Sequence, residues 1–419
     1  MNNKLWQSLV NAWKIPELRA KLLFTAAMIA IYRFGCYVPT PGIDIQALEE
    51  FFKSGNAGVV GFLDLFSGGA LARVAVFALG IMPYITASII MQLLTVVIPK
   101  LEELAKEGEQ GQKVITKYTR WLTVGLAMVQ SVGYVFLFQQ YNALPDLTWW
   151  RGALIVTTLV AGAVAVMWLG ELITARGIGN GMSIMIFISI VSRIPSGTKK
   201  LLTQSPVSIV LFIIIALAVV VAVIWITTGE RRIPVQYAKR VVGRRMMGGQ
   251  STFIPLKVNM AGVIPVIFAS SVMLIPATFA QFIDTPVTNW FKNSFSPSSF
   301  AYLVGEAILI VIFTYFYTAV TFNPIDQADN LKKYGGFVPG VRPGRPTAEY
   351  LDRILTRLTF VGALFLAAVA VLPWFLFRFM DVPFYFGGTS LLIVVGVALD
   401  TMRQMEAQLL MRHYEGFLK

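Results

Sequence analysis

Residues that catalysis, metal binding and covalent crosslinking require are scarce in this chain. Its 419 residues include one cysteine, Cys36, and one histidine, His413. A single cysteine excludes an internal disulfide and a cysteine-based metal cluster, and a single histidine in a charged tail excludes a zinc site or a Ser-His-Asp triad. The sequence also lacks a G-x-x-x-x-G-K-[ST] phosphate loop and a G-x-G-x-x-G turn after a strand. We therefore expect no enzyme, no metal and no cofactor, and any energy source must be a partner.

Charged residues are scarce too: they make up 14% of the chain, whereas 56% of the residues are hydrophobic. A membrane span needs about 20 apolar residues. Runs such as IVLFIIIALAVVVAVIWI lack the alternation of a membrane β-barrel, and a helix satisfies its own backbone hydrogen bonds in lipid. The predicted fold class is therefore an all-α polytopic membrane protein. We expect helical spans at residues 21–39, 72–98, 117–139, 152–174, 177–195, 206–228, 259–282, 301–322, 355–377 and 385–408.

The distribution of basic residues predicts the orientation. Of the 35 Lys and Arg residues, 26 lie at the amino terminus or in alternate loops on one side, and seven lie on the other side. The positive-inside rule places the basic side in the cytoplasm, so both termini are expected inside. The net charge of +13 gathers on that face, where it also attracts anionic lipids. The first apolar run follows a polar lead of twenty residues and is long enough to stay in the membrane, so we expect no cleavable signal peptide.

Residues 58–71, GVVGFLDLFSGGAL, form an apolar segment that is too short to cross a bilayer. A helix of this length covers only about 20 Å. One interpretation is an interfacial helix that rests on lipid. The other is a re-entrant piece buried within the protein, which can stopper a pore.

Two predicted cytoplasmic loops, residues 229–258 and 323–353, are far longer than hairpin connections. Alternating apolar residues in RRIPVQYAKRVV indicate short strands in the first loop. Closely spaced glycines and prolines around Arg342 exclude a regular helix there. A basic loop often only obeys the positive-inside rule, but these two are long and cationic enough to dock a large, negative partner.

The middles of the predicted spans carry almost no charge. Glu306 falls near the outer end of its span, Asp400 and Arg403 lie toward an inner end, and Arg33 can snorkel outward. Ion-coupled transporters generally need ionisable groups near the bilayer centre. A secondary transporter for small solutes is therefore the disfavoured alternative to a passive channel.

Six long runs of the sequence closely resemble the SecY family, the channel subunits of the bacterial protein translocase. These runs are FLDLFSGGAL (62–71), ALGIMPYITASIIMQLL (78–94), RGIGNGMSI (176–184), PLKVNMAGVIPVIFASS (255–271), FNPIDQADNLKKYGGFVPGVRPG (322–344) and PFYFGGTSLLIVV (383–395). The resemblance implies ten helices in two pseudosymmetric halves, residues 1–200 and 201–419, around an hourglass pore. It also implies that unfolded secretory chains cross this pore and that apolar segments leave it sideways into the bilayer.

The resemblance further implies a ring of aliphatic side chains at the waist of the pore. Such a ring can dewet and block ions, yet yield to an extended polypeptide. Met182 stands where relatives often have another isoleucine, and its place in the ring is therefore open. The expected ring residues are Ile81, Ile85, Ile186, Ile267 and Ile393.

Residues 58–71 match the plug of the family, which fills the funnel outside the ring. Gly68 and Gly69 are expected to let it hinge, and the charge of Asp64, where relatives can carry a neutral polar residue, is expected to alter how firmly it seats. The plug residues singled out are Phe62, Leu63, Asp64, Leu65, Phe66, Ser67, Gly68 and Gly69.

By the same resemblance, the second and seventh spans border a lateral gate toward lipid. Ser88 and Gln92 on one span, and Ser270 and Ser271 on the other, are expected to hold the gate shut through hydrogen bonds of about 1 kcal/mol each. An apolar signal sequence would then replace those contacts with its own buried surface.

The two basic loops match the family's docking platform for the SecA motor ATPase and the ribosome. The resemblance also implies SecE and SecG as partner subunits, signal peptides and preproteins as substrates, and the bacterial plasma membrane as the location. The expected docking residues are Arg231, Arg232, Lys239, Arg240, Arg244, Arg245 and Arg342.

Overall fold

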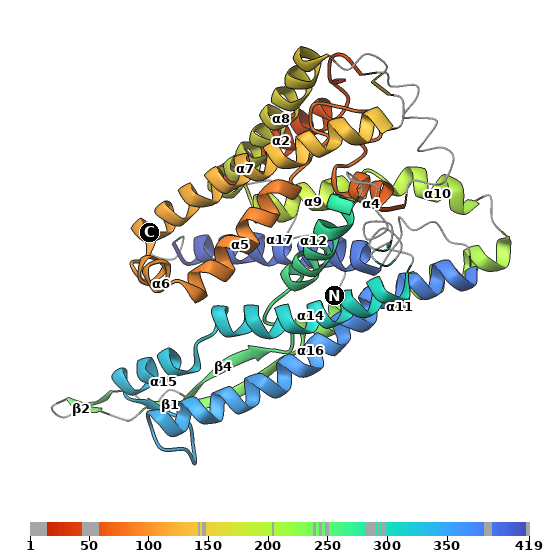
Figure 1. Ribbon diagram of the computed structural model, residues 1–419. Coiled ribbons are helices and arrows are strands. Elements are labelled where there is room, and N and C mark those ends of the chain that lie inside the picture. Colours follow the sequence, from red (N-terminus) through yellow and green to blue (C-terminus); the bar gives the residue numbers. More distant parts are fainter. Residues whose placement is uncertain are drawn as a thin grey trace.

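The molecule is a mostly helical bundle with a small sheet at one end (Figure 1). The computed structural model describes residues 15–43, 58–140, 143–144, 148–202, 205–237, 240–242, 245–247, 251–280, 290, 294, 299–380 and 388–415. The helices are α2 (Pro16–Gly35), α4 (Gly58–Phe66), α5 (Met82–Val97), α6 (Pro99–Lys106), α7 (Glu109–Gln140), α8 (Trp149–Arg176), α9 (Gly181–Val191), α10 (Ile194–Leu202), α11 (Pro206–Thr228), α12 (Ile264–Ala280), α14 (Phe300–Thr321), α15 (Pro324–Lys333), α16 (Arg345–Met380) and α17 (Gly388–Glu415). The strands are β1 (Glu230–Tyr237), β2 (Arg240–Val242), β3 (Arg245–Met247), β4 (Ser251–Lys257) and β5 (Gly336–Phe337).

Six helical stretches among the described residues are long and apolar enough to cross a membrane. The pair α5 and α6 meets at a bend of 100° and raises the number to seven if it counts as one span. The bend falls at Ile98, whose backbone is extended because the following residue is Pro99. A helix lies in each of the ten apolar segments that the sequence predicts, and the number of spans stays a prediction.

Two predicted helix starts, at residues 72 and 259, fall at least five residues too early. Residues 72–81 form turns, and α5 begins only at Met82, after Gly80 at a φ of +55°. Residues 259–263 form a turn with Gly262 at a φ of +63°, so α12 begins at Ile264. Both left-handed glycines interrupt apolar runs, and apolar composition alone does not reveal such turns.

The two long loops form a single unit, here called the platform: β1 to β5 with α15 and the turn that follows β5. Strand β1 pairs antiparallel with β4 and also with β5 of the second loop, which gives the order β4-β1-β5. The strands predicted in the first loop are confirmed, and the pairing between loops is new. A small core holds the unit together and joins it to α16; it is formed by Ile233, Val235, Leu256 and Val338, with Leu351 and Ile354 of α16.

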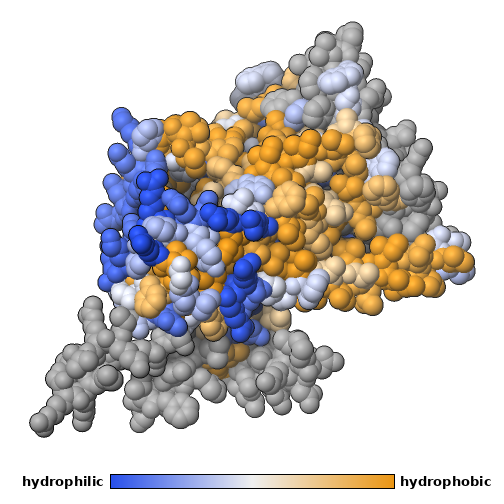
Figure 2. Space-filling view, turned by 90° about the horizontal axis from the view of Figure 1, so that it is seen from below, coloured by the Kyte–Doolittle hydropathy of each residue, from blue (hydrophilic) through white to orange (hydrophobic). Residues whose placement is uncertain are grey.

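The platform lies at the same end of the bundle as α6 and the end of α17 (Figure 1). Hydrophilic side chains gather at this end, whereas the rest of the visible described surface is largely hydrophobic (Figure 2). Exposed aliphatic side chains on α11 and α14, such as Leu217 and Ile312, contribute to the hydrophobic surface. This separation of polar and apolar surface is what a bilayer requires of a protein that crosses it.

Candidate functional site

The five predicted ring isoleucines are all buried and belong to one hydrophobic cluster. Ile81 directly precedes α5, and the others lie on α5, α9, α12 and α17. These helices form a chain of contacts: α5 contacts α12, α12 contacts α17, and α17 contacts α9. None of the five faces lipid: their exposed fractions are at most 4%. One continuous buried cluster therefore includes all five residues, which are up to 312 positions apart in the chain.

Met182 also packs against this cluster, although it is only partly buried. A Cβ built on Gly170 of α8 would lie 3.6 Å from Ile81 Cδ1 and 3.8 Å from Met182 Cγ. Met182 and Ile81 therefore both pack over the same glycine. A methionine suits such a place because its side chain is flexible and adapts to its neighbours.

Helix α4 and the turns after it lie inside the protein. Leu63, Leu65 and Phe66 are at most 7% exposed and belong to the same cluster as the ring isoleucines. Helix α4 contacts α9 and α12. The burial favours the re-entrant interpretation over a helix that rests on lipid. Phe62 belongs to α4, and its side chain is not among those that the structure describes.

Polar contacts hold the turn at the end of α4, Ser67–Gly69. The carboxylate of Asp64, which is 2% exposed, accepts hydrogen bonds from the Ala72 N–H at 2.8 Å and from Ser67 Oγ at 3.3 Å. It also forms an ion pair with Arg193. Arg33 Nη1 donates to the Gly68 carbonyl at 2.9 Å, so Arg33 binds this turn instead of snorkelling outward.

The sequence interpretation missed Arg193 as a contact of this segment. The signal was present: an aspartate in an apolar segment needs a compensating partner if it is buried. The partner itself was not identifiable, because Asp64 and Arg193 are far apart in the chain.

The predicted gate residues lie on α5 and α12, two helices that contact each other. Ser270 and Ser271 are buried, and Ser88 and Gln92 are partly buried. The expected hydrogen bonds across the gate are not found among the described residues. Ser270 Oγ instead lies 3.0 Å from Glu306 Oε1 of α14 and 2.9 Å from the Val266 carbonyl, and Ser271 Oγ donates to the Ile267 carbonyl at 2.7 Å.

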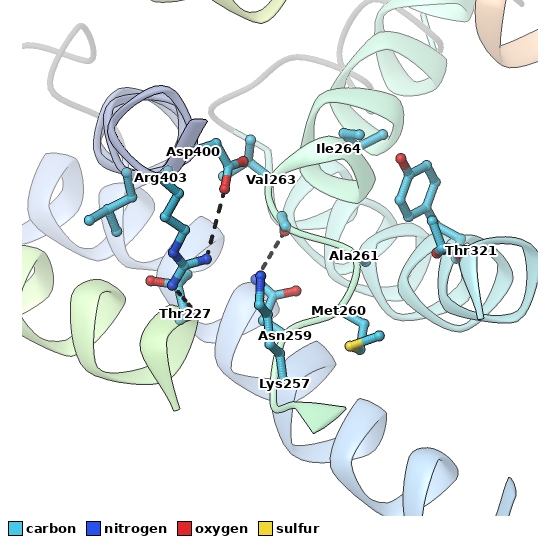
Figure 3. Close-up of a pocket in the computed structure, with 14 residues that line it drawn as sticks. Thr227, Lys257, Asn259, Met260, Ala261, Val263, Ile264, Thr321, Asp400 and Arg403 are labelled. Carbon is cyan, nitrogen blue, oxygen red and sulfur yellow. Dashed lines mark hydrogen bonds and ion pairs between the residues drawn. The ribbon is translucent and has the colours of Figure 1, made fainter. Parts of the chain in front are cut away.

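A pocket of about 190 Å³, lined by both polar and apolar residues, lies where α11 ends, β4 turns into α12, and α17 passes by (Figure 3). Arg403 Nη2 donates to the Thr227 carbonyl at 2.9 Å, and Arg403 Nη1 lies 4.0 Å from Asp400 Oδ1. Asn259 Nδ2 donates to the Gly262 carbonyl at 3.0 Å. The Asn259 contact holds the turn between β4 and α12, and the Arg403 contact joins α17 to the end of α11. The described residues contain no cluster of three His, Cys, Asp or Glu side chains that could hold a metal ion.

The platform exposes most of the predicted docking residues that the structure describes. Arg231, Arg232 and Arg342 are exposed. Arg232 Nε lies 2.7 Å from Glu230 Oε1, and its guanidinium carbon lies 4.8 Å from the centre of the Phe253 ring. Arg240 and Arg245 lie in β2 and β3, and their side chains are outside the described part; Lys239 and Arg244 are outside it altogether.

Around Arg342 the backbone runs through two left-handed glycines, Gly340 and Gly344, with φ of +83° and +97°. Thr347 Oγ1 donates to the Arg342 carbonyl at 2.8 Å. The turn therefore presents the guanidinium to solvent from a backbone that is fixed by its own hydrogen bond. The prediction that no regular helix forms here is confirmed.

Together these features define a class: a helical, multi-pass membrane protein whose centre is apolar and filled by a buried segment, with a basic platform at one end.

The model of the SecY family matches residues 75–402. Full-length relatives agree with that match. The chain is 50% identical to the protein translocase subunit SecY of Streptomyces scabiei, over 97% of this chain and 98% of the relative. It is 47% identical to the same subunit of Corynebacterium glutamicum, over 98% and 100%. The chain belongs to the SecY family.

Solved structures share the fold. One described as a protein conducting channel has a TM-score of 0.63 and 18% identity, with 94% of this chain and 96% of that chain covered. Sec61 in the canine ribosome-channel complex from the endoplasmic reticulum has a TM-score of 0.59 and 17% identity, with the same coverage.

Proposed function

We propose that this protein is a passive, gated channel that conducts unfolded secretory polypeptides across a membrane and releases apolar segments sideways into the bilayer. The observation that carries the proposal is the burial of Ile81, Ile85, Ile186, Ile267 and Ile393 in one cluster with α4. Family membership supports it, because relatives at 46% to 50% identity are named protein translocase subunits. The channel is not an enzyme, and its driving force comes from a partner.

In this proposal the molecule opens between two halves, residues 1–200 and 201–419. Helix contacts support the division: α7 packs on α5 and α8 in the first half, and α14 packs on α12 and α16 in the second. Between the halves, α5 contacts α12, α4 contacts α12, and α9 contacts α17. Separation of α5 from α12 would open a path from the centre to lipid.

The ring excludes ions because it lacks polar groups. An aliphatic constriction offers no ligand to replace the hydration shell of an ion, so a closed ring excludes ions. An extended polypeptide can displace the same flexible side chains and be surrounded by them. Helix α4 acts as the plug: its apolar side chains belong to the same buried cluster as the ring isoleucines, and it contacts α9 and α12, which carry two of them.

The gate works by exchange of contacts. Ser88, Gln92, Ser270 and Ser271 lie on the two helices that border it. A signal peptide that buries its apolar surface between α5 and α12 stabilises the open state, and it shifts the equilibrium by its difference in affinity for the two states.

The platform docks the partner that drives transport: the SecA motor ATPase or the ribosome. Exposed Arg231 and Arg342 are suited to acidic protein surfaces and to RNA phosphates. SecE and SecG complete the membrane complex. We place the protein in the bacterial plasma membrane with both termini and the platform in the cytoplasm, where the basic end also attracts anionic lipids.

Site-specific crosslinking tests the proposal. A photoreactive residue replaces Ile85, Ile186 or Ile267 in the full chain with its partner subunits, and a secretory chain is arrested during export. Crosslinks from these positions, and none from exposed Ile312 of α14, are expected. Efficient export without crosslinks at the ring would place the path elsewhere and refute the pore.

A further inference from the structure

A buried carboxyl group that the proposed channel does not use lies between α12 and α14. Glu306 of α14 is 7% exposed, and its Oε1 lies 3.0 Å from the hydroxyl of Ser270 of α12, which is fully buried. The two helices approach closely here, because a Cβ built on Gly305 would lie 3.0 Å from the Cε of Met273. The carboxyl is therefore enclosed between a gate helix of the proposed channel and the helix packed against it.

No charge that could compensate an ionised Glu306 lies on α12 or at the same level of α16, the two helices packed against α14. Helix α12 has the sequence IPVIFASSVMLIPATFA, which contains no charged or titratable residue. Two contacts fix the register of α14 against α16: Tyr315 with Thr356, and Phe300 with Trp374. This register places residues 365–368 of α16, FLAA, opposite Glu306. The titratable group that interacts with Glu306 electrostatically is Tyr302, one turn away on α14 itself.

The hydrogen bonds around Ser270 fit a protonated carboxyl. Ser270 Oγ carries one hydrogen and lies within hydrogen-bond distance of two oxygens, the Val266 carbonyl at 2.9 Å and Glu306 Oε1 at 3.0 Å. An ionised carboxylate cannot donate, so both oxygens would compete for that hydrogen, and a charge would stay buried between apolar helices. A protonated Glu306 instead donates to Ser270 Oγ, whose own hydrogen goes to the Val266 carbonyl. Each hydrogen is then used once, and no charge is buried.

We propose that Glu306 is a proton-binding site that links opening of the gate to the pH on the outer side of the membrane. The carboxyl binds a proton while α12 packs on α14, and it releases the proton when α12 moves and water reaches the carboxyl. This inference rests on the proposed function, in which α12 borders the gate. The ligand is one proton per channel, and Ser270 positions the carboxyl that binds it.

The depth of Glu306 determines the side with which it exchanges the proton. In the proposed orientation α14 starts on the outer side at Phe300, and Glu306 follows after about 9 Å of helix. The proton therefore comes from the outer compartment. Because the packed state binds the proton and the open state releases it, acid on the outer side favours the packed state, and a rise in outer pH favours opening.

The test follows opening of the full chain in its membrane complex, in planar bilayers with a synthetic signal peptide at a fixed concentration. The pH on the outer side is varied, while the pH on the cytoplasmic side is held constant. The ratio of open to closed channels should rise with outer pH, by at most about tenfold per pH unit because a single group titrates. A ratio that does not depend on outer pH refutes the proton site.

Glu306→Gln identifies the group that titrates. The amide can donate to Ser270 as the neutral acid does, but it cannot ionise, so the ratio should stay at the low-pH value of the original protein at every outer pH. Glu171→Gln is the matched control, because this carboxyl of α8 pairs with Arg120 at 2.8 Å and takes no part in the contact between α12 and α14. The control should keep the dependence on outer pH. If E306Q keeps it as well, another group titrates and the proposal is refuted.

Infrared spectroscopy gives a readout that does not require E306Q to fold. When the signal peptide opens the original protein, the C=O stretching band of a neutral carboxyl should be replaced by carboxylate bands. In Ser270→Ala the band of the neutral carboxyl should shift in frequency, because the carboxyl has lost the acceptor of its hydrogen bond. A neutral-carboxyl band that persists on opening, or that Ser270→Ala leaves in place, would also refute the site.

Failure of this inference differs from failure of the channel. If opening is independent of outer pH while an arrested secretory chain still crosslinks to Ile85, Ile186 or Ile267, the proton site is refuted and the channel stands. If the chain crosslinks to none of these positions during efficient export, the channel itself fails.

Discussion

The centre of the bundle and the platform both rest on buried aliphatic side chains, but they use them in opposite ways. At the centre, Ile81 and Ile267 are buried, and in the proposed channel they are themselves the functional groups, because an aliphatic ring excludes ions. In the platform, Val235 and Leu256 form a core whose role is to hold arginines in solvent. A substitution that adds polarity should therefore damage the centre, whereas a substitution that reverses charge should damage the platform.

Replacement of Ile81, Ile85, Ile186 and Ile267 with serine should have the largest effect. The hydroxyls allow water to occupy the constriction, so resting ion conductance in planar bilayers should rise by an order of magnitude or more. Ile308→Ser with Ile312→Ser is the matched control, since these side chains on α14 are 54% and 53% exposed. Equal conductance in the ring variant and the control would remove the distinction between the centre and the lipid-facing surface.

Ser270→Ala should have a smaller effect within the same apolar centre. The substitution removes the hydrogen bond to Glu306, a 7% exposed carboxyl, at a cost of about 1–3 kcal/mol in the free energy of unfolding. Ser271→Ala is the control, because within the described part of the chain Ser271 Oγ bonds only inside α12, to the Ile267 carbonyl. Thermal unfolding in detergent compares the two; an equal loss for both would mean that the contact between α12 and α14 adds nothing.

The centre and the platform also show which structural features can be predicted from the sequence. Apolar runs predicted where helices lie, and alternation in RRIPVQYAKRVV predicted β1, because each signal is local. The pairing of β5 with β1 was not predictable: β5 has two residues, Gly336 and Phe337, and no period can be read from two positions. Helix starts at Met82 and Ile264 were missed because glycine turns lie inside apolar runs.

Among the site residues too, some features were predictable from the sequence and others were not. The ring positions came from a resemblance that covers whole spans, and the structure buries all five. Individual polar contacts did not follow in the same way, because a hydroxyl or a carboxylate has several neighbours within reach. Ser270 was expected to contact α5 and instead contacts Glu306, and Asp64 was not assigned a partner. Long-range polar pairing depends on side-chain directions that a linear pattern does not contain.

Arg342→Glu should have the smallest effect of the three and should be confined to the platform. The side chain is exposed and the structure fixes the turn through its backbone carbonyl, so folding and resting conductance should not change. Binding of the motor or the ribosome should weaken about fivefold, near 1 kcal/mol, and the loss should shrink as salt screens the charge. Arg345→Glu is a control three residues away, where the native arginine already lies 3.3 Å from Glu349. The measurement is the affinity for the partner at two salt concentrations. If R342E binds the partner as tightly as the original protein does at low salt, the platform does not recognise its partner through this arginine. The contrast with the apolar centre then no longer rests on charge.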